Sequence, residues 1–221
     1  MERHWQHDLE ELKQRLLWMG SLAERAVRQA VHAVLDADEH LAQAVHAEED
    51  AINEMQIEID ERVQRLVALQ APMAVDLRFL LAVSRINGDL ERIGDQAVSI
   101  AHSASNILRH PQVMAYVDLP RMSELAEGMV RDSLNAVVRG DQELAQSVLL
   151  RDDQVDRLRD QMFRELLTHM MENSAMVFAA FELILVAKNL ERIGDHATNI
   201  AEDVIYAVAG RDVRHPAVDR R

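Results

Sequence analysis

Residues 90–101 read LERIGDQAVSIA, and residues 190–201 read LERIGDHATNIA. Nine of the twelve positions are identical, and the two stretches lie 100 residues apart. Self-similarity at this spacing indicates two related halves of the chain, each built around an equivalent segment. We call these two stretches the first and second motif.

Both motifs lie within a helical pattern, because apolar residues recur there at steps of three and four, with one position skipped between Val83 and Leu90 in the first half. They are Leu80, Val83, Leu90, Ile93, Ala97, Ile100, Ala104 and Ile107 in the first half, and Leu183, Val186, Leu190, Ile193, Ala197, Ile200, Val204 and Ala207 in the second. Such a stripe is typical of a helix that packs inside a bundle.

A second row of side chains, mostly acidic, follows each motif helix. Offsets of four and seven return to nearly the same side of a helix. The row contains Glu91, Asp95 and His102 in the first half and Glu191, Asp195 and Glu202 in the second. Two carboxylates four residues apart repel by roughly 0.2–0.5 kcal/mol on an exposed helix. We therefore expect a cation nearby, either a basic side chain or a metal ion.

The composition favours an all-α fold with an aliphatic core. The chain has 221 residues, of which 48% are hydrophobic and only 4% aromatic, with seven Gly and four Pro to interrupt helices. Trp5, Trp18 and the eleven Met are expected in the core. Gly94 and Gly194 recur inside the motif helices, which suggests close approach by a neighbouring helix or by something bound.

The predicted architecture is a tandem repeat of two three-helix bundles. We expect helices over residues 3–36, 39–69, 73–109, 121–139, 141–171 and 175–209. The first bundle would cover residues 1–110 and the second 121–210, with a proline-bounded linker at 111–120 and a polar tail at 211–221. Asp141 is a plausible N-cap, and Gly140 and Gly210 are expected to end helices.

Charge and residue content exclude several classes of function. The formal net charge is -14, which argues against a broad nucleic-acid surface. The absence of Cys excludes disulfides, thiolate nucleophiles and Cys-based zinc or iron–sulfur sites. We see no nucleophile–base set and no phosphate-binding glycine loop, so the sequence predicts no enzyme. A carboxylate-bridged metal oxidase is disfavoured because the motifs lack a Glu-x-x-His pattern.

The sequence gives no indication of a signal peptide or membrane span. It is charged from residue 2, and its longest apolar segment, Ala175–Ala187, is interrupted by Glu182. We therefore expect a cytoplasmic protein without direct membrane insertion.

The second helix of each half supplies further polar residues at helical spacing. Glu49 and Asn53 are four apart, as are Asp152 and Asp156, in the related strings EDAIN and DDQVD. Antiparallel packing against the motif helices would bring these residues to the carboxylates of the motifs, in the layout of carboxylate metal sites in bundles. Mg, Mn, Fe or Zn would suit such ligands. His102, Glu202 and Asn199 are weaker, auxiliary candidates.

Ordinary salt bridging is an equally open interpretation of the same acids. Arg92 is three residues from both Asp89 and Asp95, and Arg85 is four from Asp89. In the second motif, Arg192 is three residues from Asp195. Such pairs stabilise a helix surface by about 0.2–0.5 kcal/mol each.

The two motifs, together with QAPMAVDLRFLLAV (70–83) and IYAVAGRDVRH (205–215), resemble the PhoU family over essentially the whole chain. The resemblance implies a cytoplasmic, frequently dimeric, negative regulator of the phosphate-starvation response. Its partners would be the ATPase subunit of the Pst phosphate ABC transporter and a sensor histidine kinase of the PhoR type.

Some members of this family bind metal clusters through acidic motifs, so the resemblance also implies which residues of this chain would be metal ligands. The ligands would fall on Glu91, Asp95, Glu191, Asp195, Asp152, Asp156 and Glu49, with Asn53 where a further acid could stand. Two hypotheses follow from the sequence. One is a regulatory adaptor without catalysis, and the other is a protein whose bound metal senses phosphate or carries redox chemistry.

Overall fold

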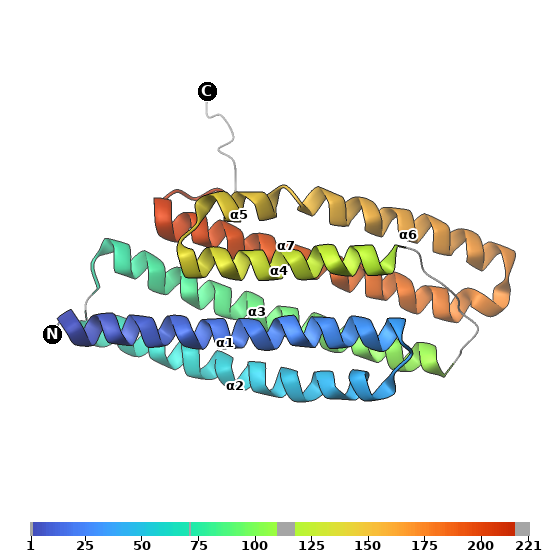
Figure 1. Cartoon of the computed structure of the whole chain (residues 1–221), viewed down its shortest axis with the longest axis horizontal. Helices are drawn as coiled ribbons and strands as arrows, with labels where there is room; N and C mark the ends of the chain where they lie inside the picture. The colour runs from blue at the N-terminus through green and yellow to red at the C-terminus, as the bar shows by residue number, and fades with distance from the viewer. Residues whose placement is uncertain (1, 71, 110–117, 215–221) are drawn as a thin grey trace, which may run out of the picture.

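The computed structural model describes residues 2–70, 72–109 and 118–214, and in this part of the chain the secondary structure is entirely helical. The helices are α1 (Glu2–Leu35), α2 (Glu39–Gln70), α3 (Ala74–Leu108), α4 (Leu119–Arg139), α5 (Gln142–Leu149), α6 (Asp152–Glu172), the 3₁₀ helix η1 (Ser174–Met176) and α7 (Val177–Ala209). They lie side by side along one long axis (Figure 1). The predicted all-α fold is confirmed.

Each half contributes three rows of helix to one continuous core. In the first half α1, α2 and α3 all pack against one another, and in the second half α4, α5 and α6 pack against α7. Leu16, Ile52 and Leu90 are fully buried representatives of the first three helices. On each of these helices the buried apolar residues recur at steps of three and four, the pattern that the sequence shows. This pattern gives each helix one apolar side, which packs into the bundle.

The predicted fifth helix is wrong in one respect, because a turn at Leu150–Arg151 divides it into α5 and α6. Arg151 leaves the helical row to contact α4, where its Nη2 donates to Asp132 Oδ2 at 2.7 Å. The backbone N–H of Arg151 bonds the carbonyl of Val148 at 3.0 Å, a tighter, three-residue step. Val148 and Val155 remain buried on either side, so the apolar period conceals the break.

The helix ends follow the sequence signals closely. Asp141 Oδ1 accepts a hydrogen bond from the Leu144 N–H at 3.0 Å, which is the expected N-cap of α5. Gly140 and Gly210 end α4 and α7 with φ of 60° and 66°, left-handed values that favour glycine. α4 begins at Leu119, two residues earlier than predicted, because Pro120 fits within its first turn. Of the predicted linker at 111–120, residues 111–117 lie outside the described residues.

The two halves meet along α3 and α7, which are antiparallel. Polar contacts that join them include Arg85–Asp203 at 3.0 Å, Asp89–His196 at 2.9 Å and Asn106–Glu182 at 2.9 Å. In this series the residue numbers rise on α3 as they fall on α7. We call this junction the seam. It places the two motif helices next to each other in the middle of the molecule (Figure 1).

Small residues allow close helix contacts at two places. A Cβ added at Gly94 would lie 3.1 Å from Ile52 Cδ1 on α2, so the expected close approach by a neighbouring helix is confirmed there. At Gly194 the nearest atoms, from Met129 and Val155, are at an ordinary 3.7 Å. A Cβ at Gly20 would lie 2.6 Å from Leu134, where α1 meets α4.

The core is aliphatic, as predicted, but not every large apolar residue is inside it. Trp18 is 54% exposed, which corrects its predicted place in the core, and Arg25 lies over its ring at 5.7 Å. Met73 and Met171 are exposed as well, since both lie at the turns that join the second and third helices of each half. Trp5 is partly buried and packs against the core.

Candidate functional site

Four carboxylates gather where α6 meets α7, and we call them the second acid cluster: Asp152, Asp156, Glu191 and Asp195. The pKa of Asp195 is raised to about 6, first by partial burial and then by the negative charges of Glu191, Asp152 and Asp156. Burial and the neighbouring acids also raise the pKa of Asp152. Charges must be close to act in this way. The structure therefore brings together the four residues that the sequence grouped.

Arg159 supplies positive charge to this cluster, and the sequence analysis missed it. Its Nη1 lies 2.6 Å from Glu191 Oε1 and 3.6 Å from Asp156 Oδ1, and its Nη2 lies 2.9 Å from Asp160. The available signal was its spacing of three residues from Asp156 on the same helix. Arg159 is a basic side chain of the kind expected beside these crowded carboxylates.

The corresponding residues of the first half form the first acid cluster: Glu49, Asn53, Glu91 and Asp95. Asn53 Nδ2 donates to Glu49 Oε1 on the adjacent turn of α2. Burial raises the pKa of Glu91, and the charges of Asp95 and Glu49 raise it further, against the opposing effect of Arg92. Glu49 of α2 and Glu91 of α3 are thus electrostatic neighbours, as expected for antiparallel helices.

The auxiliary candidates have neighbours of other kinds. His102 packs edge-on against His46 of α2, with ring centroids 5.2 Å apart. Asn199 Nδ2 donates to Asp89 Oδ1 across the seam at 3.3 Å. Glu202 acts electrostatically on Arg214 in the segment after α7.

The salt-bridge interpretation also needs correction at Arg85. This guanidinium pairs across the seam with the buried Asp203, not with Asp89 on its own helix. Asp89, which is 7% exposed, is instead bonded by His196 and Asn199 of α7. Patterns within one helix did not reveal these pairs, because the partners are far apart in the chain. His196 lies 107 residues after Asp89, and Asp203 lies 118 residues after Arg85.

Within the described ranges, no three His, Asp or Glu side chains are arranged so that they could hold a metal ion. In the second acid cluster, Arg159 stands between Glu191 and Asp156. A metal held by these oxygens would therefore require Arg159 to turn away and the carboxylates to rotate inward.

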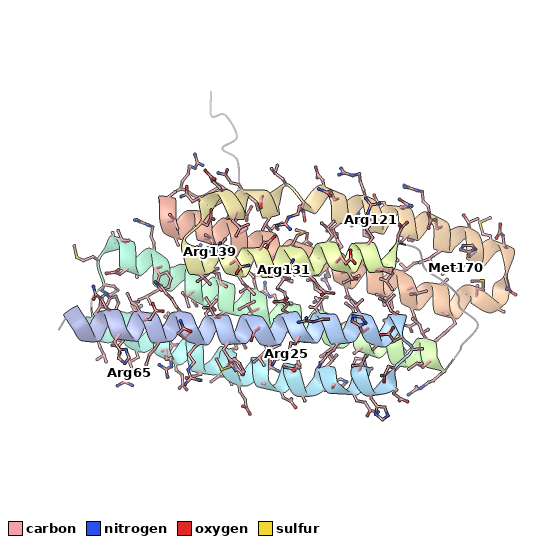
Figure 2. The ribbon with its side chains drawn as sticks, in the orientation of Figure 1. Arg25, Arg65, Arg121, Arg131, Arg139 and Met170 are labelled. Carbon is pink, nitrogen blue, oxygen red and sulfur yellow. The ribbon has the colours of Figure 1, made fainter. Side chains whose placement is uncertain are left out.

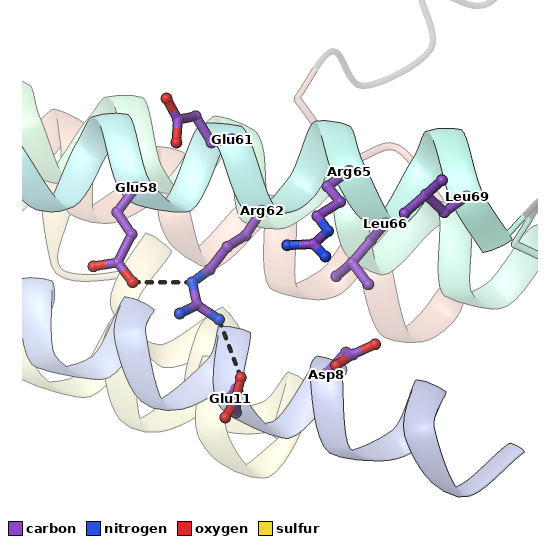
Figure 3. A pocket seen from close by; sticks show the side chains of 8 residues that line it. All are labelled: Asp8, Glu11, Glu58, Glu61, Arg62, Arg65, Leu66 and Leu69. Carbon is purple, nitrogen blue, oxygen red and sulfur yellow. Dashed lines mark hydrogen bonds and ion pairs between the residues drawn. The ribbon is translucent and has the colours of Figure 1, made fainter. Parts of the chain in front are cut away.

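A charged groove of about 690 Å³ between α1 and α2 contains none of the predicted site residues. Arg62 spans it, with Nε 3.0 Å from Glu58 and Nη1 3.1 Å from Glu11, and Arg65 points into it (Figure 3). Elsewhere, the labelled Arg25, Arg121 and Arg139 are spread along the molecule (Figure 2). The described part of the chain has no helix that is both long and apolar enough to cross a membrane.

Comparison with known proteins identifies the family. The family sequence profile described as the PhoU domain matches residues 16–104 and again residues 119–204, one match in each half. The "Phosphate-specific transport system accessory protein PhoU homolog" of Pseudomonas putida is 42% identical over 214 residues, covering 96% of this chain and 84% of that protein. Its counterpart from Pseudomonas aeruginosa is also 42% identical, covering 96% and 88% of the two chains.

Solved structures agree with the sequence comparison. The crystal structure of PhoU from Pseudomonas aeruginosa superposes with a TM-score of 0.91 at 41% identity, covering 94% of this chain and all of that one. The phosphate transport system regulatory protein PhoU from Streptococcus pneumoniae gives a TM-score of 0.88 at 27% identity, covering 96% of this chain. With the doubled motif, the paired three-helix halves and these matches, the chain belongs to the PhoU family.

Proposed function

We propose that this chain is a non-enzymatic regulator of phosphate uptake and of the phosphate-starvation response. It acts negatively, linking a phosphate ABC transporter of the Pst type to a sensor histidine kinase of the PhoR type. The observation that carries the proposal is the name of its relatives, accessory proteins of the phosphate-specific transport system, at 42% identity over 96% of the chain.

The charge of the molecule supports partners with basic surfaces. The net charge is -14, and each half presents an acid cluster on its second and third helices. Complementary charge accelerates encounter and fixes orientation. The proposed partners are the transporter's ATPase subunit and the kinase, and the proposed setting is the cytoplasm, with the chain as a homodimer.

The test of this function is a deletion strain with a reporter for a phosphate-repressed gene. Without the protein, the reporter should stay on when phosphate is plentiful, and a plasmid copy of the gene should restore repression. Normal repression in the deletion strain, together with purified protein that captures neither the kinase nor the ATPase subunit, would sink the proposal.

Metal binding is the second candidate, favoured by the shifted carboxylates of the acid clusters. The ligands in this proposal are Asp152, Asp156, Glu191 and Asp195 in one cluster and Glu49, Asn53, Glu91 and Asp95 in the other. Their oxygen donors fit Mn, Mg, Fe or Zn. A bound cation would relieve the repulsion that raises the pKa of Asp195 and would offer coordination positions for phosphate oxygens.

We expect added Mn²⁺ or Zn²⁺ to raise the melting temperature of chelator-treated protein, because a ligand that binds only the folded state stabilises it. Differential scanning calorimetry measures the change. The double variant Glu191→Ala, Asp195→Ala should lose the part of the shift that the second acid cluster contributes. An equal shift in wild type and double variant would remove these two residues from the ligand set.

A further inference from the structure

The outer side of α6 and α7 carries two matching rows of side chains. On α7 the row contains Val177, Phe181, Ile184, Lys188, Glu191 and Asp195, and on α6 it contains Leu167, Phe163, Arg159, Asp156 and Asp152. Successive members are three or four residues apart, so each row keeps to one side of its helix. The helices run antiparallel from the turn that joins them (Figure 1), so both rows lead from that turn to the second acid cluster.

A groove of about 350 Å³ lies between the two rows. Phe163 and Ile184 line one part of it, and Arg159 and Glu191 line another. The contact of 2.6 Å between Arg159 and Glu191 links the helices at this point. Of the second acid cluster only Glu191 lines the groove, beside Arg159, Asp160 and Lys188. Asp156 and Asp152 follow about one and two turns beyond Arg159 on α6, and exposed apolar side chains continue both rows in the other direction.

The apolar end leaves much of its side-chain surface in contact with water. Phe163 and Phe181 are 48% and 52% exposed, and Leu167 and Val177 are each 44% exposed. These residues lie on neighbouring turns of two adjacent helices, so they form one patch rather than scattered single residues. Contiguous apolar surface of this kind marks interaction sites in soluble proteins.

The opposite end carries excess negative charge. Arg159 is paired with Asp156, Glu191 and Asp160. On these two rows and the groove between them, five acids, Asp152, Asp156, Asp160, Glu191 and Asp195, stand against the two basic side chains of Arg159 and Lys188. A ligand that brings positive charge to this end would balance this excess.

We infer that this groove binds an amphipathic helix of a partner protein, with its apolar stripe against Phe163, Phe181 and Ile184 and its basic residues against Asp152 and Asp156. The inference rests on the proposed function, which places the activity of the chain in protein contacts. The α7 row from Val177 to Asp195 is about 27 Å long at 1.5 Å per residue, so it accommodates about five turns of helix.

The chemistry of the groove selects this occupant. Anchors at steps of three and four match the apolar stripe of a helix laid into a groove. Exposed aromatic residues are frequent energetic centres of interfaces. The change from apolar to acidic along the groove gives the bound helix a direction, because only one orientation sets its basic residues on the carboxylates.

The test uses the full-length protein in chelating buffer and an 18-residue fluorescent peptide with a leucine stripe in one half and lysines in the other. A peptide of the same composition with its stripe scrambled is the control. Fluorescence anisotropy should show the striped peptide binding at least tenfold more tightly, with an affinity that falls as salt increases.

Two variants of the protein locate the site. Phe163→Ala with Phe181→Ala should weaken the striped peptide at least tenfold, and Asp152→Asn with Asp156→Asn should reduce its salt dependence. Trp18→Ala removes an aromatic side chain of similar exposure on α1 and should leave the affinity unchanged. Circular dichroism should show all three variants folded, because these side chains are largely at the surface.

Equal affinity for the two peptides, or no effect of the double phenylalanine change, would overturn the inference. A dimer in analytical ultracentrifugation that the same change converts to monomer would also overturn it, because a second copy would then occupy the groove. Normal repression in the deletion strain beside intact peptide binding would instead reject the proposed function alone. Peptide binding that fails while the deletion strain loses repression would reject the groove alone.

Discussion

Asp195 is the residue at which the structure makes the clearest electrostatic prediction. Its pKa rises from 3.8 to about 6 in the folded protein. The folded state therefore binds more protons than the unfolded state between these values, and stability must fall as pH rises through this window. In metal-free protein, the contribution of Asp195 to the free energy of unfolding should therefore be more favourable near pH 4.5 than near pH 7. Asp195→Asn should flatten that fall and stabilise the protein at pH 7.

Urea denaturation of the two proteins in chelating buffer at several pH values measures the effect. Asp156→Asn is the matched control, because it removes a neighbouring acid whose loss also lowers the repulsion but leaves Asp195 ionisable. The control should keep part of the pH dependence. A wild type and an Asp195→Asn variant with parallel stability profiles between pH 4 and 7 would show that the crowding is relieved in solution.

Single residues also show where sequence reasoning stops. The acids of both clusters could be identified from spacing alone, because helical geometry fixes which positions share a side. Arg159 was missed although its spacing was visible, and His196 was missed because its partner Asp89 belongs to the other half. By the alignment of EDAIN with DDQVD, the first half has Gln56 where the second has Arg159. The two clusters thus differ in charge balance despite the repeat.

At the scale of the helix, three glycines allow the effect of helix propensity on stability to be distinguished from the effect of packing. Gly88 has no atom within 4 Å of an added Cβ, Gly94 has Ile52 at 3.1 Å, and Gly20 has Leu134 at 2.6 Å. Alanine gains about 1 kcal/mol over glycine inside a helix when nothing opposes it. Gly88→Ala should therefore increase the free energy of unfolding by about that amount, and Gly94→Ala should give less. Gly20→Ala should decrease it, since overpacking costs about 1–3 kcal/mol.

Urea titrations of the three variants give the ranking directly, with Gly88→Ala as the internal control for helix propensity. A Gly20→Ala variant as stable as Gly88→Ala would mean that the Leu134 side chain can turn aside at little cost.

Helix positions were largely predictable from the sequence, and the exception has a physical cause. Apolar period, prolines and glycine C-caps located the six predicted segments, whose ends fall close to those in the structure. The turn at Leu150–Arg151 was invisible because it keeps Val148 and Val155 on the buried side. At that turn Arg151 contacts Asp132 on another helix, a partner that the local sequence does not indicate.

At the scale of the whole molecule, the doubled motif predicted two halves but not how they join. Burial of apolar stripes dictates that each half forms a bundle, whereas the seam depends on which polar residues meet across it. Asp89, Asp203 and Glu182 are all buried there and all have partners on the opposing motif helix. Buried charges without partners would cost several kcal/mol, so these pairs restrict how the halves can pack.

The seam should therefore show strong energetic coupling between the halves. In a double-mutant cycle on Asp89 and His196, each single change to Ala leaves a partner in a site where Asp89 is 7% exposed. We expect a coupling of about 1–3 kcal/mol in the free energy of unfolding. His32 and Asp36 are the matched control, since they are also 2.9 Å apart but lie on the surface at the C-terminal end of α1. Exposed pairs of this kind couple by about 0.2–1 kcal/mol. Urea denaturation at constant pH measures both cycles, and a seam coupling no larger than that of the control would mean that the halves are held together by apolar packing alone.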